Sequence, residues 1–106
     1  MVRSGQVIRH TGDVVIVGDV NPGAEVAAGG DIYIWGRLHG IAHAGAMGDD
    51  KAVICALDLS PMQLRIAQLV ARAEDNEHRK SQGPEIAYVR KDGIVVEPWH
   101  KAPRRT

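Results

Sequence analysis

Three aspartates, each directly after a glycine, recur at a constant spacing, at Asp13, Asp31 and Asp49. If the chain repeats with that spacing, the three carboxylates stack in one column, and carboxylate oxygens are the ligands that hard cations prefer. The calcium-binding repeat has a nine-residue Gly-Gly-x-Gly-x-Asp pattern, however, and that pattern is absent. Aspartate beside glycine is also a common turn pair, because its side chain bonds the local backbone. We therefore expect turn residues here and no metal site.

Histidine and cysteine are the other residues that could do chemistry. His39 and His43 are four positions apart, a spacing that converges on a helix but crosses a corner in a stack of strands. The single Cys55 excludes an internal disulfide, and no base is placed to activate it as a nucleophile. No glycine-rich loop precedes a helix, so the sequence predicts no nucleotide or other cofactor. We expect that this chain is not an enzyme.

Composition limits the class of protein. The 106 residues suffice for one small domain, and a hydrophobic content of 44% suffices for a core. Lys plus Arg and Asp plus Glu each number 13, and this zero net charge argues against a nucleic-acid-binding protein, which needs a basic face. No apolar run approaches the roughly 18 residues of a membrane span, and Met1 is not followed by a signal peptide. A cytoplasmic protein is expected.

The elements that would position these residues follow from a repeat within residues 12–47. The shift that places Asp13 on Asp31 also places Ile16 on Ile34, with glycines matching on both sides. The same shift places the alanine-rich segment 24–28 on segment 42–46. A fixed period of about 20 residues is typical of a solenoid, in which each repeat buries its apolar side against its neighbours.

The pattern inside each repeat indicates strands. Apolar residues recur at every second position, as at Val14 and Ile16. Glycines such as Gly18 and Gly23 stand where a strand has to turn. Three short strands, three corners and a return after about 18 residues describe an all-β fold, a three-sided parallel β-helix. Two similar β-hairpins that match by chance are the alternative.

The outer side of the repeat carries large apolar residues. If Val14 and Ile16 face the core, the residues between and beyond them face outward. Exposed apolar patches usually mark an interface, and symmetric homodimers are its commonest form. A loop or the C-terminal tail covering this face is the alternative. The predicted dimer interface comprises Val15, Val17, Tyr33, Trp35 and, from a third strand, Val53 and Cys55.

Residues 60–73 are ambiguous. A Ser-Pro start and the spacing of the apolar residues favour a helix. Leu64 and Ile66, with a polar residue between them, also fit a strand that extends the stack. The local pattern leaves both possibilities open.

The remaining sequence predicts a loop, a hairpin and a tail. Residues 74–84 are charged and predict an exposed loop. The apolar stretches 85–90 and 94–99 flank a turn sequence and predict a hairpin. We place the β-helix domain at residues 1–100 and expect the basic tail, residues 101–106, to be disordered.

Several longer motifs point to a known family. They are Arg-Ser-Gly-Gln at 3–6, Gly-Asp-Val-Asn-Pro-Gly-Ala at 18–24, Ala-Gly-Gly-Asp-Ile at 28–32, Trp-Gly-Arg-Leu-His-Gly-Ile-Ala-His-Ala-Gly at 35–45, Pro-Met-Gln-Leu-Arg-Ile at 61–66, and the ending 85–99. With these motifs the sequence resembles the C-terminal domain of MinC, the bacterial division-site inhibitor, over essentially its whole length. The resemblance implies a right-handed β-helix that dimerises through one flat apolar face. It also implies that residues 61–70 continue the strands.

The resemblance further implies an adaptor function. Domains of this family bind the ATP-bound dimer of MinD on the membrane and help to direct inhibition of FtsZ ring assembly. The protein would then reach the inner face of the plasma membrane only through MinD. Ile41 stands where some members carry an Arg implicated in the FtsZ contact. The MinD contact would map onto Arg3, Ser4, Gly5 and Gln6, with Gly23 at the neighbouring corner.

Two other functions fit parts of the pattern. Open coil ends could stack end to end, as in the bactofilin filament formers, which gives a self-assembling structural protein. The left-handed β-helix acyltransferases use a His at a subunit interface. Their strict six-residue repeat is interrupted here at Gly18, Asn21-Pro22 and Gly40.

Overall fold

The computed structural model describes residues 1–72 and 83–101. The loop predicted at 74–84 and the tail predicted at 101–106 therefore lie mostly outside the described residues. The described part contains strands, one short 3₁₀ helix, η2 (Trp99–Lys101), and no helix long and apolar enough to cross a membrane. Its strands are β1 (Val7–His10), β2 (Val14–Val17), β3 (Glu25–Ala28), β4 (Ile32–Leu38), β5 (Ile41–Ala44), β6 (Ile54–Leu59), β7 (Gln63–Ile66), β8 (Leu69–Arg72), β9 (Glu85–Arg90) and β10 (Gly93–Pro98).

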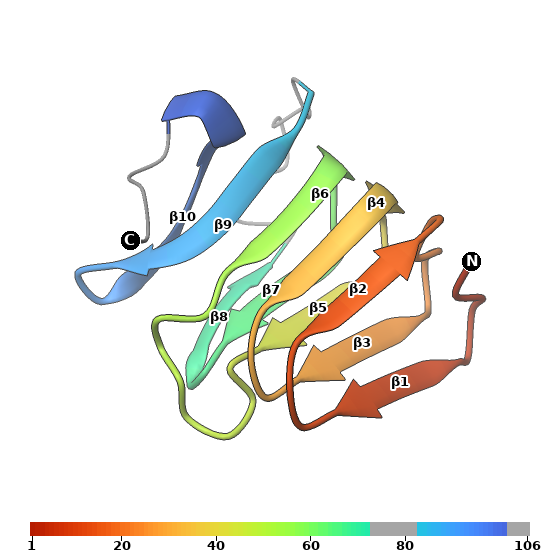
Figure 1. Ribbon diagram of the computed structural model, residues 1–106, viewed down its shortest axis with the longest axis horizontal. Coiled ribbons are helices and arrows are strands. Elements are labelled where there is room, and N and C mark those ends of the chain that lie inside the picture. The colour runs from red at the N-terminus through yellow and green to blue at the C-terminus, as the bar shows by residue number, and fades with distance from the viewer. Residues whose placement is uncertain (73–82, 102–106) are drawn as a thin grey trace.

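The strands form two five-stranded sheets that face each other across the core (Figure 1). Sheet A has the order β10-β9-β6-β4-β2, and sheet B has the order β1-β3-β5-β7-β8. The chain passes back and forth between the sheets, so successive coils stack in parallel. The third side is short, with isolated parallel bridges from Val2 to Val20 and from Val20 to Leu38. The predicted all-β solenoid of stacked coils is confirmed.

The predicted period holds in the first coil and then changes. Ile16 pairs with Ile34, at the predicted spacing. The repeat from β3 to β5 in sheet B is shorter than predicted, because Val26 pairs with Ala42 and not with Ala44. The predicted superposition of segment 24–28 on segment 42–46 is therefore wrong.

Corner lengths explain the changed register. Glu25 follows the bridge residue Val20 by five positions, whereas Ile41 follows Leu38 by three. The next corner is longer, since residues 45–53 connect β5 to β6. In consequence β4 pairs with a later segment than the period predicts, and Ile32 lies beside Ile54 at the start of this pairing.

The core between the sheets is built from small and branched aliphatic residues. Inward positions alternate with outward ones along β2, β3, β4 and β5, as the period-two pattern predicts. Alanines at many inward positions keep the coil interior narrow. The largest fully buried side chains are Ile32, Ile34, Leu38, Ile54, Leu59, Ile66, Val20 and Val26.

The described part of the ambiguous segment 60–73, which ends at Arg72, contributes strands and not the helix that local spacing favours. β7 pairs in parallel with β5, and β8 turns back to pair antiparallel with β7. The reversal occurs at Ala67, whose φ of 53° lies in the left-handed region. The edge of β5 offers backbone partners and an apolar surface, and this long-range pairing outweighs a weak helical preference.

The predicted hairpin at the end of the chain is confirmed and closes the stack. β9 and β10 pair antiparallel, and β9 also pairs antiparallel with β6. The hairpin therefore covers the end of sheet A that is opposite to β2 (Figure 1). At the other end β1 and β2 are edge strands, and Ile8 stays partly exposed because no coil lies beneath it.

Candidate functional site

The first candidate surface is a turn at the start of the chain, residues 3–6. The Gln6 N–H donates to the Arg3 carbonyl at 2.9 Å, and Gly5 between them has a φ of 85°, as in a type II turn. A residue with a side chain avoids this φ, so glycine is favoured here. The Gln6 side chain also closes the turn, because its Oε1 accepts from the Arg3 N–H at 2.6 Å. All four residues are exposed.

A second turn of the same kind lies directly against the first. The Ala24 N–H donates to the Asn21 carbonyl at 3.0 Å, and Gly23 has a φ of 86°. The Gly5 N–H donates to the Gly23 carbonyl at 3.0 Å, which joins the two turns. A Cβ built on Gly23 would overlap the Ser4 side chain. The structure thus brings all five residues predicted for partner binding into one exposed surface, here called the turn edge: Arg3, Ser4, Gly5, Gln6 and Gly23.

A polar column along the short third side supports the turn edge. The Val2 N–H donates to the Asp19 carbonyl at 2.8 Å, and the Val2 carbonyl accepts from the Asn21 N–H at 2.9 Å. The Asp19 carboxylate in turn accepts from the Arg37 N–H at 2.8 Å and pairs with the Arg37 guanidinium at 3.0 Å. These bonds from the Arg37 backbone and then its side chain lower the pKa of Asp19 below its usual value.

The second candidate surface is the outer side of sheet A, here called the apolar face. Val15 and Trp35 are each 67% exposed, and Val17 is 78% exposed. Tyr33 and Cys55 are paired in register and partly exposed, so the face continues from β4 onto β6. The predicted apolar patch therefore exists on the surface of the single chain.

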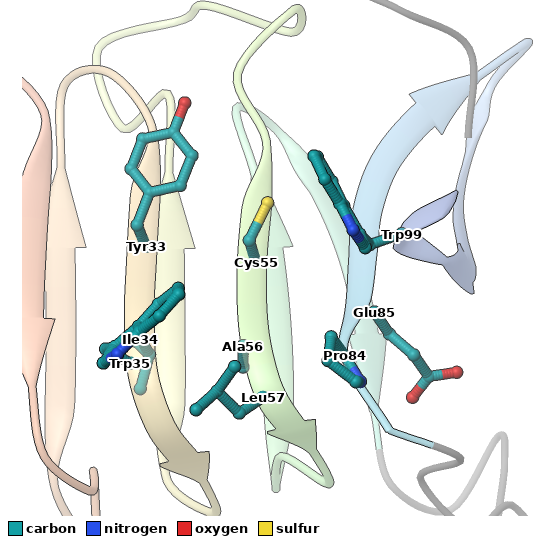
Figure 2. Close-up of a pocket in the computed structure, with 9 residues that line it drawn as sticks. All are labelled: Tyr33, Ile34, Trp35, Cys55, Ala56, Leu57, Pro84, Glu85 and Trp99. Atoms are coloured by element: carbon teal, nitrogen blue, oxygen red, sulfur yellow. The ribbon is translucent and has the colours of Figure 1, made fainter. Parts of the chain in front are cut away.

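A groove of about 300 Å³ crosses the apolar face (Figure 2). Figure 2 shows Cys55 on the middle strand, between Tyr33 on one side and Trp99 on the other. Trp35 and Leu57 line the groove further along β4 and β6. Aromatic side chains with a polar tip suit a surface that is covered in an assembly.

The prediction of Val53 as part of the apolar face is wrong. Val53 is only 3% exposed, so its side chain cannot take part in an outward interface. The long corner 45–53 shifts the register, and the Val53 N–H donates to Asp31 Oδ1 at 2.9 Å.

In the predicted aspartate column, the Asp13 carboxylate accepts from the Asp31 N–H in the same way, at 2.7 Å. The predicted column therefore contains Asp13 and Asp31 with Val53 above them, and the two carboxylates cap backbone N–H groups of the next coil.

Sequence reasoning missed Leu57, Pro84 and Trp99, which also line the groove. Leu57 is 38% exposed and stands two positions after Cys55, so the period-two pattern carried one step further would have found it. Trp99 is 64% exposed and reaches the face only because the β9–β10 hairpin folds back onto β6. No local pattern signals that contact.

His39 and His43 do not converge on one site. His39 Nε2 lies 3.4 Å from Asp58 Oδ2, whereas His43 Nε2 lies 3.0 Å from the Ala67 carbonyl. Within residues 1–72 and 83–101, no group of three or more His, Cys, Asp or Glu residues could hold a metal ion.

Comparison with known proteins gives the family. Residues 1–99 match the family described as septum formation inhibitor MinC, C-terminal domain. A probable septum site-determining protein MinC from Heliobacterium modesticaldum is 52% identical over 99 residues, which are 93% of this chain and 34% of that protein. The corresponding protein from Symbiobacterium thermophilum is 55% identical over 96 residues, which are 91% of this chain and 42% of that protein. The chain thus spans less than half the length of these relatives.

A solved structure agrees with the sequence match. A chain in the MinC:MinD cell division protein complex of Aquifex aeolicus is 44% identical to this chain and superimposes with a TM-score of 0.88. The match covers 95% of this chain and 83% of that chain. With the family match over residues 1–99, this likeness shows that the chain belongs to the family of MinC C-terminal domains.

Proposed function

We propose that this chain is the dimerising, partner-binding domain of a cell-division inhibitor. In this proposal it binds ATP-bound MinD through the turn edge and helps to direct inhibition of FtsZ assembly for septum placement. It acts as an adaptor and catalyses no reaction. MinD brings the domain from the cytoplasm to the inner face of the plasma membrane, so its membrane contact is indirect.

The turn edge is the observation that carries the proposal. Two glycine turns in direct contact present backbone groups and small side chains, so a partner's backbone can approach closely. Arg3 stands beside them with a guanidinium that can pair with a carboxylate. The similar Aquifex aeolicus chain comes from a MinC:MinD complex, which supports MinD as a partner of this chain.

The apolar face supports the dimer. Large exposed apolar side chains on one flat sheet are typical of an interface, and an isologous contact places the same face of each copy against the other. The turn edge lies at a corner of the coils, outside sheet A, and stays accessible in such a dimer. The proposed interface comprises Val15, Val17, Tyr33, Trp35 and Cys55, to which the groove adds Leu57 and Trp99.

Co-sedimentation with MinD on lipid vesicles tests this function, with ATP and with ADP. We expect ATP-dependent recruitment that Arg3→Ala abolishes and Arg9→Ala retains. Arg9 is a matched control because it is also exposed and lies on β1, outside the turn edge. Equal recruitment of Arg3→Ala and the wild type would refute the proposed site, and no recruitment with either nucleotide would refute MinD as the partner.

End-to-end assembly into filaments is less compatible with the fold. Stacking needs two open coil ends, but the antiparallel hairpin β9–β10 closes one of them. Among the described strands, β1 and β2 provide the parallel edges at the other end. Electron microscopy of the protein alone is expected to show no filaments.

A further inference from the structure

The turn edge is held from one side only. It belongs to the first coil, and none of the described strands lies beneath it, so within the described residues its position depends on hydrogen bonds to the coil above. Segments held by few such bonds open most readily. Four backbone bonds hold the segment from residue 2 to residue 6: Val2 N–H to the Asp19 carbonyl (2.8 Å), Asn21 N–H to the Val2 carbonyl (2.9 Å), Gly5 N–H to the Gly23 carbonyl (3.0 Å) and Glu25 N–H to the Gln6 carbonyl (3.0 Å).

Asp19 connects this segment to the rest of the solenoid. Its carbonyl accepts from Val2 on the lower side, while its carboxylate accepts from the Arg37 N–H on the upper side. The carboxylate also pairs with the Arg37 Nη2 at 3.0 Å. A neighbouring backbone bond joins the same two coils, since the Val20 N–H donates to the Arg37 carbonyl at 2.8 Å. Asp19 is therefore bound on both sides, to the turn segment and to β4.

We infer that Asp19, through its contact with Arg37, is a positioning residue for the MinD-binding turn. The inference rests on the proposed function of the turn edge. Asp19 acts through Val2, because its carboxylate is directed at Arg37 and its carbonyl at the segment that leads into Arg3. A fixed carboxylate orients the Asp19 peptide group, and the oriented carbonyl holds Val2. When that contact is lost, the turn adopts its binding conformation in only a fraction of the molecules. The apparent affinity for a partner is then reduced in proportion to that fraction.

Asp19→Ala tests the inference, with Asp58→Ala as a matched control. Asp58 lies on β6 opposite Arg37 of β4, one coil further on, and its carboxylate accepts from Ser60 Oγ at 2.8 Å. It is therefore a similar carboxylate that has no link to Val2. We expect Asp19→Ala to bind MinD about tenfold more weakly. Asp58→Ala is expected to bind as the wild type does.

Amide hydrogen exchange supplies a readout that separates positioning from general destabilisation. In Asp19→Ala, protection is expected to fall at Val2 and Gly5 and to stay unchanged at Ile34 in the core. Asp19→Asn keeps one oxygen for the Arg37 N–H and is expected to restore most of the protection and binding.

Three results would overturn the inference. They are wild-type binding by Asp19→Ala, weaker binding with unchanged exchange at Val2 and Gly5, and a loss of protection that includes Ile34. Failure of the wild-type protein to bind MinD would instead overturn the proposed function. The exchange comparison would then still decide whether Asp19 holds the turn.

Discussion

Gly23 illustrates how one residue can shape both a turn and a surface. Its φ of 86° belongs to the left-handed region, and its missing side chain makes room for Ser4 of the coil below. The two requirements are independent, because the first concerns the backbone and the second concerns the contact between coils. Gly5 meets only the first, since nothing lies within 4 Å of a Cβ built there.

This difference gives a prediction for the two glycines. Gly5→Ala is expected to cost about 1 kcal/mol of folding stability, from backbone strain alone. Gly23→Ala should cost about 2 to 3 kcal/mol, because the overlap with Ser4 adds to the same strain. Denaturant unfolding measures both values. Equal costs for the two variants would mean that the Ser4 contact relaxes freely.

The ion pair of Asp19 with Arg37 predicts a pH dependence. Because the pKa of Asp19 is lower in the folded chain than its ordinary value, the interaction stabilises the fold above that ordinary value. The contribution is lost as the pH falls through the folded pKa, which places the loss below about pH 4. Thermal unfolding between neutral and acid pH should show a shallower decline for Asp19→Asn than for the wild type. Parallel curves would show that the pair does not contribute.

At the scale of the elements, the corner 45–53 decides which residues of the third coil are inside. Because this corner is long, β6 is displaced in register, and Val53 lies over Asp31 at a buried corner position. Cys55, two residues on, is outside and pairs with Tyr33.

Two side-chain truncations test whether Val53 is inside and Val15 is outside. Val53→Ala is expected to cost about 2 kcal/mol of unfolding free energy, since a buried Val loses contacts in the core. Val15→Ala removes the same atoms from an exposed position and should change the stability by less than about 0.5 kcal/mol. Both are compared in the Trp35→Glu background, so that loss of dimer contacts does not add to either value. Similar costs at the two sites would contradict the register.

For the whole molecule, the two proposed surfaces are separate. The apolar face lies on sheet A, whereas the turn edge lies at the corner between the short third side and sheet B. A dimer through sheet A would therefore present two turn edges, and binding to MinD on a membrane would gain from both being engaged together.

Trp35→Glu tests the arrangement of the whole molecule. A charge placed in a buried apolar contact is costly, so sedimentation equilibrium should show monomers. Val70→Glu is the control, because Val70 is also an exposed apolar residue but lies on sheet B. The monomer is expected to bind soluble MinD as before and to be recruited less strongly to MinD-coated vesicles. A Trp35→Glu variant that stays dimeric would place the interface elsewhere.

The sequence by itself determined the features that depend on neighbouring residues. Alternation marked the inward side of the strands, glycines marked the turns, and the repeat placed Gly5 next to Gly23. The hairpin at 85–99 followed from two apolar stretches around a turn. These properties are local because backbone conformation and strand alternation are set within a few residues.

Only the tertiary structure decided the features that depend on how coils align. The shortened step from Val26 to Ala42 and the burial of Val53 result from corner lengths that differ from coil to coil. Residues 63–66 and 69–72 became strands because the edge of β5 was available to pair with β7, and β7 with β8. Trp99 joined the apolar face because β9 pairs with β6 across a long stretch of sequence. In each case contacts between distant segments outweigh the local preference, since they bury more apolar surface and satisfy more backbone groups than the local alternative.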